Sequence, residues 1–401
     1  MMNNKVLMVA LELPPCRSAG VQRTLRFTEF LAKYGWQPHV ITASDNIYDR
    51  RDETQTIEPE VAKHIIRAKS IDASESLAIK GRYFQWMTLP DRYWPWYFDA
   101  VKKASAVIEK EQPAVIWSTY PVLTAHLIAR KLKKKYGIKW VADFRDPLQC
   151  RYDNKAQQYA WLKKWLEKRI IESADKVVFT SERAANFYRE LYTEQAADKF
   201  ITIENGFYGD DAIQANHLEP SREKFKLLYS GSLYANGRDP LPLFKSIAEL
   251  KKRALINNKN FVLTFRPGQK STFEKVLVAL DINDIVEFLP SCSFDEAVAE
   301  MKCASATVLI QDDIFKRQIP GKIYDYILAR RPILAITPKN SATADLINKI
   351  SYGFSAQNEQ EITTCLQQLI EHDIACNEDI SHYSRESKTA QLANAFDALT
   401  E

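Results

Sequence analysis

The segment from Gln318 to Ile327 places a lysine and a carboxylate where they could act on one ligand. It reads Gln-Ile-Pro-Gly-Lys-Ile-Tyr-Asp-Tyr-Ile, and an apolar run at 332–336 follows it. Lys322 and Asp325 are three residues apart, so on a helix their side chains lie on one face. The ammonium can bind phosphate oxygens, and the carboxylate can accept hydrogen bonds from ribose hydroxyls. The pair suits a nucleoside diphosphate, and a solvated surface pair is the alternative.

A second candidate for phosphate binding is the loop within residues 228–240, which follows a predicted strand. Gly231 lets the backbone come close to a ligand. Arg238 stands directly before a predicted helix, where its guanidinium could bind a pyrophosphate through two hydrogen bonds. Arg238 alone could be an ordinary surface residue. Together with Lys322 in the same half of the chain, it makes a more specific pattern.

Near the N-terminus a predicted strand leads through a loop at 11–24 into a helix. Backbone N–H groups at the start of a helix bind anions, and Arg17 and Arg23 would lie nearby. The loop contains one glycine, Gly20, so the three-glycine fingerprint of dinucleotide-binding proteins is absent. An anion site and a plain connecting loop both remain open.

Three charged residues, Asp143, Arg145 and Asp146, lie at the end of a predicted buried strand. Burying charged groups at the end of a strand costs free energy unless they form ion pairs or bind a ligand. The carboxyl ends of strands in open α/β sheets form the binding edge of the sheet. We therefore predict a functional role for at least one of the three, with an Asp–Arg pair that braces the loop as the alternative.

Residues that could hold a metal are sparse. His126 follows a predicted strand near the start of a helix, where a lone histidine is more often packed than catalytic. The chain contains no Asp-x-Asp sequence, and its six cysteines show no spacing typical of metal ligands. We expect no metal, no cofactor and no disulfide framework, and a reducing compartment fits this composition.

Length and composition indicate a globular protein of two or three domains. The chain has 401 residues, 46% of them hydrophobic and 26% charged. No apolar run reaches the length of about eighteen residues that a membrane span needs, and the first apolar run is too short for a signal sequence. The expected location is cytoplasmic.

The charge is unevenly distributed between the two halves. Residues 1–200 hold 33 lysines and arginines against 24 acidic residues, whereas residues 201–401 hold 22 against 27. Basic residues concentrate at 131–135 and 163–169, and aromatic residues at 83–86 and 94–98. Solvated helix faces explain each basic run alone. Taken together, the runs suggest peripheral contact of residues 1–200 with an anionic membrane surface.

Short apolar runs alternate with amphipathic stretches along the whole chain, which is typical of parallel sheets with helical crossovers. Strands are predicted at 6–10, 39–42, 115–118, 140–143, 176–180, 200–203, 226–230, 261–265, 285–289, 306–310, 332–336 and near 353. The predicted domains are a Rossmann-like domain at 1–205, a linker at 206–225, a second Rossmann-like domain at 226–380 and a helix at 381–401 that could pack back on the first domain. The fold class is α/β, with two Rossmann-like domains that face each other across a cleft.

With these motifs in place, the chain resembles the GT-B glycosyltransferases, and among them family 4, in a branch associated with bacterial surface polysaccharides. The resemblance covers nearly the whole chain and depends on the order of six motifs. They are Pro-Pro-x(4)-Gly-x-Gln-Arg at 14–23, Ala-Asp-Phe-Arg-Asp-Pro at 142–147, 174–181, Ile-Glu-Asn-Gly-Phe at 203–207, 229–238, and Ile-Pro-Gly-Lys at 319–322 through Pro332.

The resemblance implies sugar transfer with retention, without a metal ion, from a nucleotide-diphosphate sugar to a glycan or lipid-linked acceptor. The donor would lie against Gly231, with its diphosphate on Arg238 and Lys322 and its ribose on Asp325. The acceptor would approach the Gly20 loop and the segment 143–146, where Gly20, Arg23 and Arg145 would contact it or its phosphate. The candidates for a catalytic role are Asp143, Asp146 and His126. No nucleic-acid partner is expected.

The chain departs from the family pattern at two positions. The family pairs two glutamates eight residues apart, and this sequence has Arg317 at the first position and Asp325 at the second. An epimerase or hydrolase of nucleotide sugars on the same fold is one alternative, because fold does not fix function. A non-catalytic partner in a polysaccharide assembly complex is the other.

Overall fold

The computed structural model describes residues 4–18, 20–77, 82–148, 159–209, 224–233 and 237–401. The chain divides into two compact units, each with its own parallel sheet: residues 1–205 with 385–401, and residues 206–384. Most of the predicted linker, 210–223, lies outside the described residues. No helix in the described part of the chain has the length and apolar character needed to cross a membrane.

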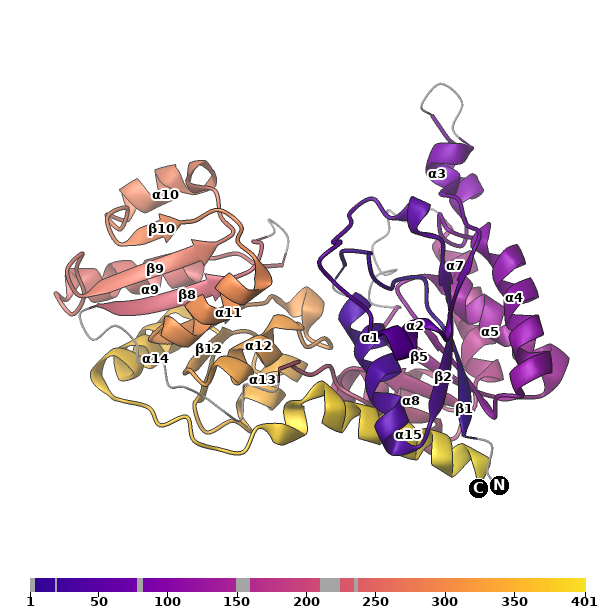
Figure 1. Cartoon of the computed structure of the whole chain (residues 1–401). Coiled ribbons are helices and arrows are strands. Elements are labelled where there is room, and N and C mark those ends of the chain that lie inside the picture. The colour runs from indigo at the N-terminus through magenta and orange to yellow at the C-terminus, as the bar shows by residue number, and fades with distance from the viewer. Residues whose placement is uncertain (1–3, 19, 78–81, 149–158, 210–223, 234–236) are drawn as a thin grey trace. The chain divides into compact units, whose positions relative to one another are not determined.

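The first unit contains a seven-stranded sheet in the order β3-β2-β1-β4-β5-β6-β7, with all neighbours parallel (Figure 1). The strands are β1 (Lys5–Val9), β2 (Gln37–Ala43), β3 (Ile65–Ala68), β4 (Val115–Thr119), β5 (Lys139–Arg145), β6 (Lys176–Phe179) and β7 (Phe200–Thr202). Its helices are α1 (Val21–Phe30), α2 (Pro59–Ala62), α3 (Ala73–Ser76), α4 (Trp96–Glu111), α5 (Leu123–Tyr136), α7 (Ala160–Ser173), α8 (Glu182–Leu191) and α15 (Arg385–Thr400). Strand β3 escaped the sequence prediction because its four residues carry no clear alternation of apolar and polar side chains.

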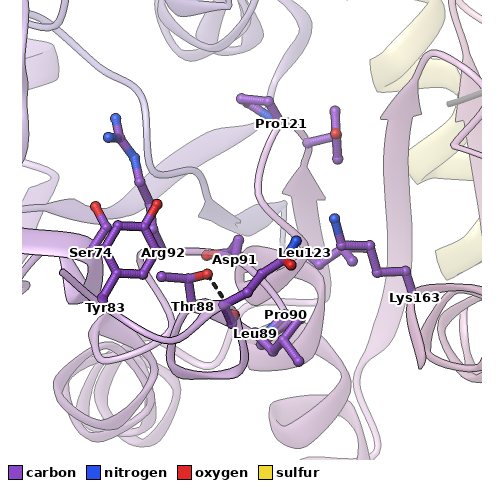
Figure 2. A pocket seen from close by; sticks show the side chains of 12 residues that line it. Ser74, Tyr83, Thr88, Leu89, Pro90, Asp91, Arg92, Pro121, Leu123 and Lys163 are labelled. Atoms are coloured by element: carbon purple, nitrogen blue, oxygen red, sulfur yellow. Dashed lines mark hydrogen bonds between the residues drawn. The ribbon is translucent and has the colours of Figure 1, made fainter. Parts of the chain in front are cut away.

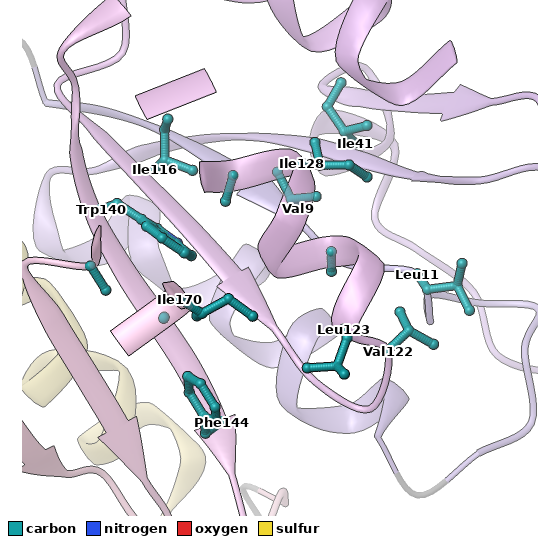
Figure 3. Packing of buried hydrophobic residues seen from close by; sticks show 14 of the residues in the cluster. Val9, Leu11, Ile41, Ile116, Val122, Leu123, Ile128, Trp140, Phe144 and Ile170 are labelled. Carbon is teal, nitrogen blue, oxygen red and sulfur yellow. The ribbon is translucent and has the colours of Figure 1, made fainter. Parts of the chain in front are cut away.

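Alternate residues of β1 enter two separate cores, one on each face of the sheet. Leu7 and Val9 pack into the larger core with the side chains of α4 and α5, part of which Figure 3 shows. Val6 and Met8 pack into the core on the opposite face. The strand is therefore apolar at every position, as expected for a parallel sheet covered on both faces.

Helix α15 belongs to the first unit although it ends the chain, and it lies beside α1 in Figure 1. The ring of Phe396 meets Trp36 edge to face with centroids 5.2 Å apart. The Trp36 indole N–H donates to Asp397 Oδ1 at 2.9 Å, and Lys388 Nζ lies 3.0 Å from Glu204 Oε2. Both polar contacts and the apolar contact attach this last helix to the N-terminal sheet.

The second unit contains a six-stranded parallel sheet in the order β10-β9-β8-β11-β12-β13. The strands are β8 (Phe225–Ser230), β9 (Phe261–Arg266), β10 (Val286–Phe288), β11 (Ala306–Ile310), β12 (Ile333–Ile336) and β13 (Gly353–Ala356). The helices are α9 (Leu241–Lys252), α10 (Glu274–Ala279), α11 (Phe294–Cys303), α12 (Lys322–Ala329), α13 (Ala342–Ile347) and α14 (Glu359–Glu371). The two parallel sheets with their helices confirm the predicted α/β class with two Rossmann-like domains.

Local sequence signals set several helix ends. A left-handed backbone at Gly137, with φ +72°, ends α5, and Gly35 with φ +79° ends the turn that follows α1. Ser293 and Glu296 form the predicted capping box at the start of α11. The helix expected at 24–34 begins three residues earlier, at Val21, and its last turn is a 3-10 helix.

Candidate functional site

Lys322 stands at the start of α12, and its ammonium is buried without a counter-ion among the described residues. Nζ lies 3.7 Å from the centroid of the Tyr229 ring and makes no hydrogen bond within the described residues. Burial, and then the positive charge of Arg238, hold the pKa of Lys322 well below its ordinary value. A cation over an aromatic face gains about 0.5–2 kcal/mol, which does not offset the loss of hydration. The site is therefore suited to an anion.

The loop after β8 has room for this ammonium because it has a glycine at position 231. Gly231 has φ +128°, and a Cβ at this position would come within 2.9 Å of Lys322 Nζ. A larger residue would meet both backbone strain and a clash. Arg238 donates to the Ser232 carbonyl oxygen at 3.0 Å, within the same loop. The structure thus brings the predicted residues Gly231, Arg238 and Lys322 together at the carboxyl end of β8.

Buried hydrogen bonds hold the surroundings of this site. The Tyr326 hydroxyl accepts from the Ser230 N–H at 2.9 Å and is 3.2 Å from the Ser230 carbonyl oxygen. Burial raises the pKa of Tyr326, so it stays neutral and can donate. Gln311 Nε2 donates to the carbonyl oxygens of Phe315 and Gln318, both at 3.1 Å. These bonds fix the end of β8 and the loop that leads into α12.

Asp325 lies one turn after Lys322 on α12 and is partly exposed. Arg317, at the position where the family pattern has its first glutamate, is partly exposed in the loop before the helix. The helical spacing predicted for Lys322 and Asp325 is confirmed by the bounds of α12. The ribose contact of Asp325 stays a prediction.

In the first unit, Arg23 of α1 and Asp143 of β5 form a buried ion pair. The guanidinium donates to both carboxylate oxygens, at 2.8 and 3.0 Å. It also donates to the carbonyl oxygens of Ile203 at 2.9 Å and Glu204 at 3.0 Å, and Thr119 Oγ1 donates to Asp143 at 2.9 Å. The direct partner of Asp143 is thus Arg23 of α1, whereas the alternative considered from the sequence was a local pair with Arg145.

Arg145 lies beside this pair and contacts it through Thr119. Its Nε donates to Thr119 Oγ1 at 2.9 Å, and Nη1 lies 3.9 Å from Glu12 Oε2. Nη2 is buried and has no hydrogen-bond partner in the described chain, and burial lowers the pKa of the guanidinium. A Cβ at Gly20 would lie 2.0 Å from Glu12 Oε2 and 2.3 Å from Arg145 Nη1. The structure thus places Gly20, Arg23, Asp143 and Arg145 at one edge of the sheet.

The other two catalytic candidates lie in different surroundings. His126 is fully buried, stacks on Phe144 with ring centroids 4.9 Å apart, and has Nδ1 2.8 Å from Ser118 Oγ. Burial lowers its pKa to about 3. The histidine belongs to the core, as the more common interpretation had it, so it does not enter the proposed site. Asp146 follows β5 and is partly exposed.

Three participants had no role in the sequence prediction: Glu12, Thr119 and Tyr229. Glu12 and Thr119 stand at or just after the carboxyl ends of β1 and β4, which is a signal that sequence carries. Tyr229 is an inward residue of β8, and nothing in its spacing indicates that a lysine from α12 rests on its ring.

One group of carboxylates in the described chain has the spacing of a metal site. Asp49, Asp72 and Glu75 bring oxygens within 4.8 Å of one another. Arg92 occupies this cluster, with guanidinium nitrogens 2.6 Å from Asp49 Oδ2 and 3.1 Å from Asp72 Oδ2. A cation thus already pairs with two of the three carboxylates, and the cluster does not include the residues around Lys322.

Comparison with solved structures defines the class of the fold. A glycosyltransferase from Rickettsia africae ESF-5 matches with a TM-score of 0.61 and 12% identity, over 100% of this chain and 99% of that chain. Anabaena Alr3699/HepE in complex with UDP gives 0.59 and 12%, over 99% and 97%. Sucrose-phosphate synthase from Thermosynechococcus elongatus gives 0.57 and 15%, over 99% and 96%. The chain has the GT-B fold of glycosyltransferases.

A comparison with family models gives a match in the N-terminal half of the chain. Residues 20–208 match Glycosyltransferase Family 4. The match begins at Gly20 and contains the Arg23–Asp143 pair and Arg145. A search of curated proteins gives no match. The chain therefore has the GT-B fold, and its residues 20–208 are similar to Glycosyltransferase Family 4.

The buried pair predicts a large structural penalty when one partner is lost. Asp143→Ala leaves the Arg23 guanidinium uncompensated, so the free energy of unfolding should fall by about 3–5 kcal/mol. The control is Asp198→Ala, which removes an exposed ion pair with Lys176 and should cost at most about 1 kcal/mol. Urea denaturation measures both. A loss for Asp143→Ala no larger than that of the control would contradict the internal role of this pair.

Proposed function

We propose that this protein is a glycosyltransferase that moves a sugar from a nucleoside-diphosphate sugar to a glycan or lipid-linked acceptor. The C-terminal unit would bind the donor, and the N-terminal unit would receive the acceptor. The observation that carries the proposal is the ammonium of Lys322, which is buried on the Tyr229 ring beside Arg238 and has no counter-ion in the part of the chain that the structure describes. A diphosphate would supply the missing negative charge. Solved structures of HepE with UDP and with UDP-glucose, on the same fold, support a donor of this class.

In this proposal the two cations act on the leaving group. The bond between the anomeric carbon and the phosphate oxygen breaks, and negative charge grows on the diphosphate. Lys322 and Arg238 would stabilise this charge more in the transition state than in the ground state, which is how a site accelerates a reaction. Asp325 would hold the ribose hydroxyls.

Transfer with retention is part of the proposal. The acceptor hydroxyl would attack from the side of the leaving group, and a glycosidic bond would form. The acceptor proton would pass to the departing phosphate oxygen, so the step requires no separate protein base. This route is compatible with the positions of His126 in the core and of Asp143 in an ion pair. The pathway that we propose is the synthesis of a bacterial surface polysaccharide.

The donor site can be tested by removing the charge of Lys322. Lys322→Met keeps an apolar stem against Tyr229 and should weaken UDP binding by roughly ten- to a hundredfold, because one charge-assisted hydrogen bond is lost. The control is Lys316→Met in the loop before α12, where the lysine pairs with Asp313. Isothermal titration calorimetry measures both.

The low pKa of Lys322 adds a second measurement to the same experiment. A bound diphosphate favours the charged ammonium and raises this pKa, so UDP binding should take up protons at any pH between the pKa of the free protein and that of the complex. Titrations in buffers of different ionisation enthalpy detect this uptake, and Lys322→Met should abolish it. UDP affinity of the variant equal to that of the wild type would show that the donor site lies elsewhere.

We also propose that transfer requires no metal ion. The proposal is motivated by the absence of an Asp-x-Asp sequence and by the two cations available for the diphosphate. Turnover of the donor should persist in excess EDTA. Loss of turnover on chelation, with recovery on adding magnesium or manganese, would contradict this proposal.

A membrane contact through α7 is a further part of the proposed function. Trp161 and Trp165 are 69% and 50% exposed, and Lys164 and Lys168 are exposed beside them. Positions 161, 164, 165 and 168 follow the spacing of one helix face. An exposed face that combines tryptophan and lysine fits the interface of an anionic bilayer.

Vesicle co-sedimentation tests this contact. Each lysine near an anionic bilayer adds about 1 kcal/mol, and salt screens the attraction over roughly 8 Å. Binding to anionic vesicles should fall in Trp161→Ala/Trp165→Ala and in high salt. Phe294→Ala, which removes an exposed aromatic residue of the second unit, should bind as the wild type does. Equal binding to neutral and anionic vesicles, or no binding to either, would indicate a solvated face.

A further inference from the structure

The N-terminal unit contains a cavity of about 330 Å³ (Figure 2), and neither Arg23 nor Asp143 lines it. This volume is at the lower end of the range for small-ligand sites, roughly 300–1,000 Å³. The segment 83–92 forms one wall, the loop after β4 forms another, and α3 and α7 contribute one residue each. The lining residues are Ser74, Tyr83, Gln85, Thr88, Leu89, Pro90, Asp91, Arg92, Tyr120, Pro121, Leu123 and Lys163.

Hydrogen bonds hold the 83–92 wall in place. Asp91 accepts from the N–H and the hydroxyl of Thr124, both at 2.8 Å, and from the N–H of Tyr93 at 3.0 Å. The wall is thereby attached to the first turn of α5. The Trp94 indole N–H donates to the Met87 carbonyl oxygen at 2.8 Å, which fixes the 3-10 helix Gln85–Thr88. A ligand would therefore meet a preformed surface, which reduces the entropic cost of binding.

The charges of this cavity do not favour an anion. The guanidinium of Arg92 is already bound to Asp49 and Asp72. The positive charge of Lys163 acts on the buried carboxyl group of Asp91, whose pKa burial raises. A phosphorylated ligand would find cations that are already compensated. The cavity instead offers aromatic faces, hydroxyls and an amide, from Tyr83, Thr88 and Gln85 among others.

This combination fits a neutral sugar. A sugar ring has an apolar face that can stack on an aromatic ring, and its hydroxyls both donate and accept hydrogen bonds. Tyr83 is 49% exposed and Gln85 is exposed, so both can contact an incoming ligand.

A second, smaller hollow connects this cavity to the predicted acceptor loop. It measures about 180 Å³, shares Arg92 and Pro121 with the first, and is also lined by Glu12 and Ser18. Glu12 lies next to Gly20 and Arg145, as described above. On the other side, the Tyr120 N–H donates to the Asp143 carbonyl oxygen at 3.0 Å. The two hollows thus follow one edge of the sheet toward Arg145.

We propose that the larger cavity binds a neutral sugar of the acceptor glycan, remote from the sugar that reacts, with the chain continuing through the smaller hollow. The inference rests on the proposed function and adds the acceptor class: a neutral oligosaccharide of more than one residue. Binding energy from such a remote unit can position the reacting hydroxyl. Tyr83 and Gln85 are then residues that determine acceptor specificity.

Saturation-transfer NMR on the full-length protein tests the inference with defined probes. The probes are p-nitrophenyl glycosides of neutral hexoses and N-acetylhexosamines, with glucose 1-phosphate and inorganic phosphate as the anionic set. At least one neutral glycoside should bind. Tyr83→Ala and Gln85→Ala should each weaken this binding about fivefold or more, the effect of losing one hydrogen bond or ring contact. Tyr34→Ala, which removes an exposed tyrosine elsewhere in the same unit, should leave it unchanged.

UDP calorimetry on the same variants separates this inference from the proposed function. Tyr83→Ala and Gln85→Ala should bind UDP as the wild type does, which also shows that they are folded. The inference is overturned if no neutral glycoside binds, if binding persists unchanged in both variants, or if the phosphorylated probes bind in preference. If Lys322→Met binds UDP as tightly as the wild type does, the proposed donor site is wrong. The sugar-binding measurements would then still stand as an independent result.

Discussion

The buried pair between Arg23 and Asp143 is the interaction on which the carboxyl edge of the N-terminal sheet depends. A charged pair without solvent is stable only when every charge is met by hydrogen bonds. Here the guanidinium also donates to the carbonyl oxygens of Ile203 and Glu204, and the Thr119 hydroxyl donates to the Asp143 carboxylate. These hydrogen bonds connect α1, β4, β5 and the segment that follows β7. Arg145 and Gly20 take their positions from this arrangement.

The C-terminal unit, in contrast, contains a buried charge that is not paired with any described residue. Its buried cation, Lys322, has no partner within the described residues and rests on the ring of Tyr229. An uncompensated charge costs stability, and burial accordingly lowers the pKa of the ammonium. A compensated pair braces a fold, whereas an uncompensated cation is suited to a ligand of opposite charge. This contrast explains why we assign anion binding to Lys322 and a structural role to Arg23 and Asp143.

A parallel sheet with helical crossovers also explains where the remaining candidates lie. Strands end at one edge, so loops that are far apart in sequence, such as those after β1, β4 and β5, meet there. Glu12, Thr119 and Arg145 meet in this way, and the two hollows of the first unit open along the same edge. Arg92, which lines both hollows, is already paired with Asp49 and Asp72, which is why we infer a neutral sugar there.

The sequence by itself determined the class of the fold and most of its strands, because apolar alternation and helix-end signals are local. It also placed Lys322, Arg238 and Gly231 in one candidate site, since the order of βα loops follows from chain order. It missed β3, whose four residues carry little pattern, and it considered a local pair with Arg145 as the alternative for Asp143, whose partner is Arg23. Only the tertiary structure decided which charges meet, because Arg23 and Asp143 are 120 residues apart and come together through packing between distant segments. For the same reason the stacking of Lys322 on Tyr229 and the burial of His126 could not be read from spacing.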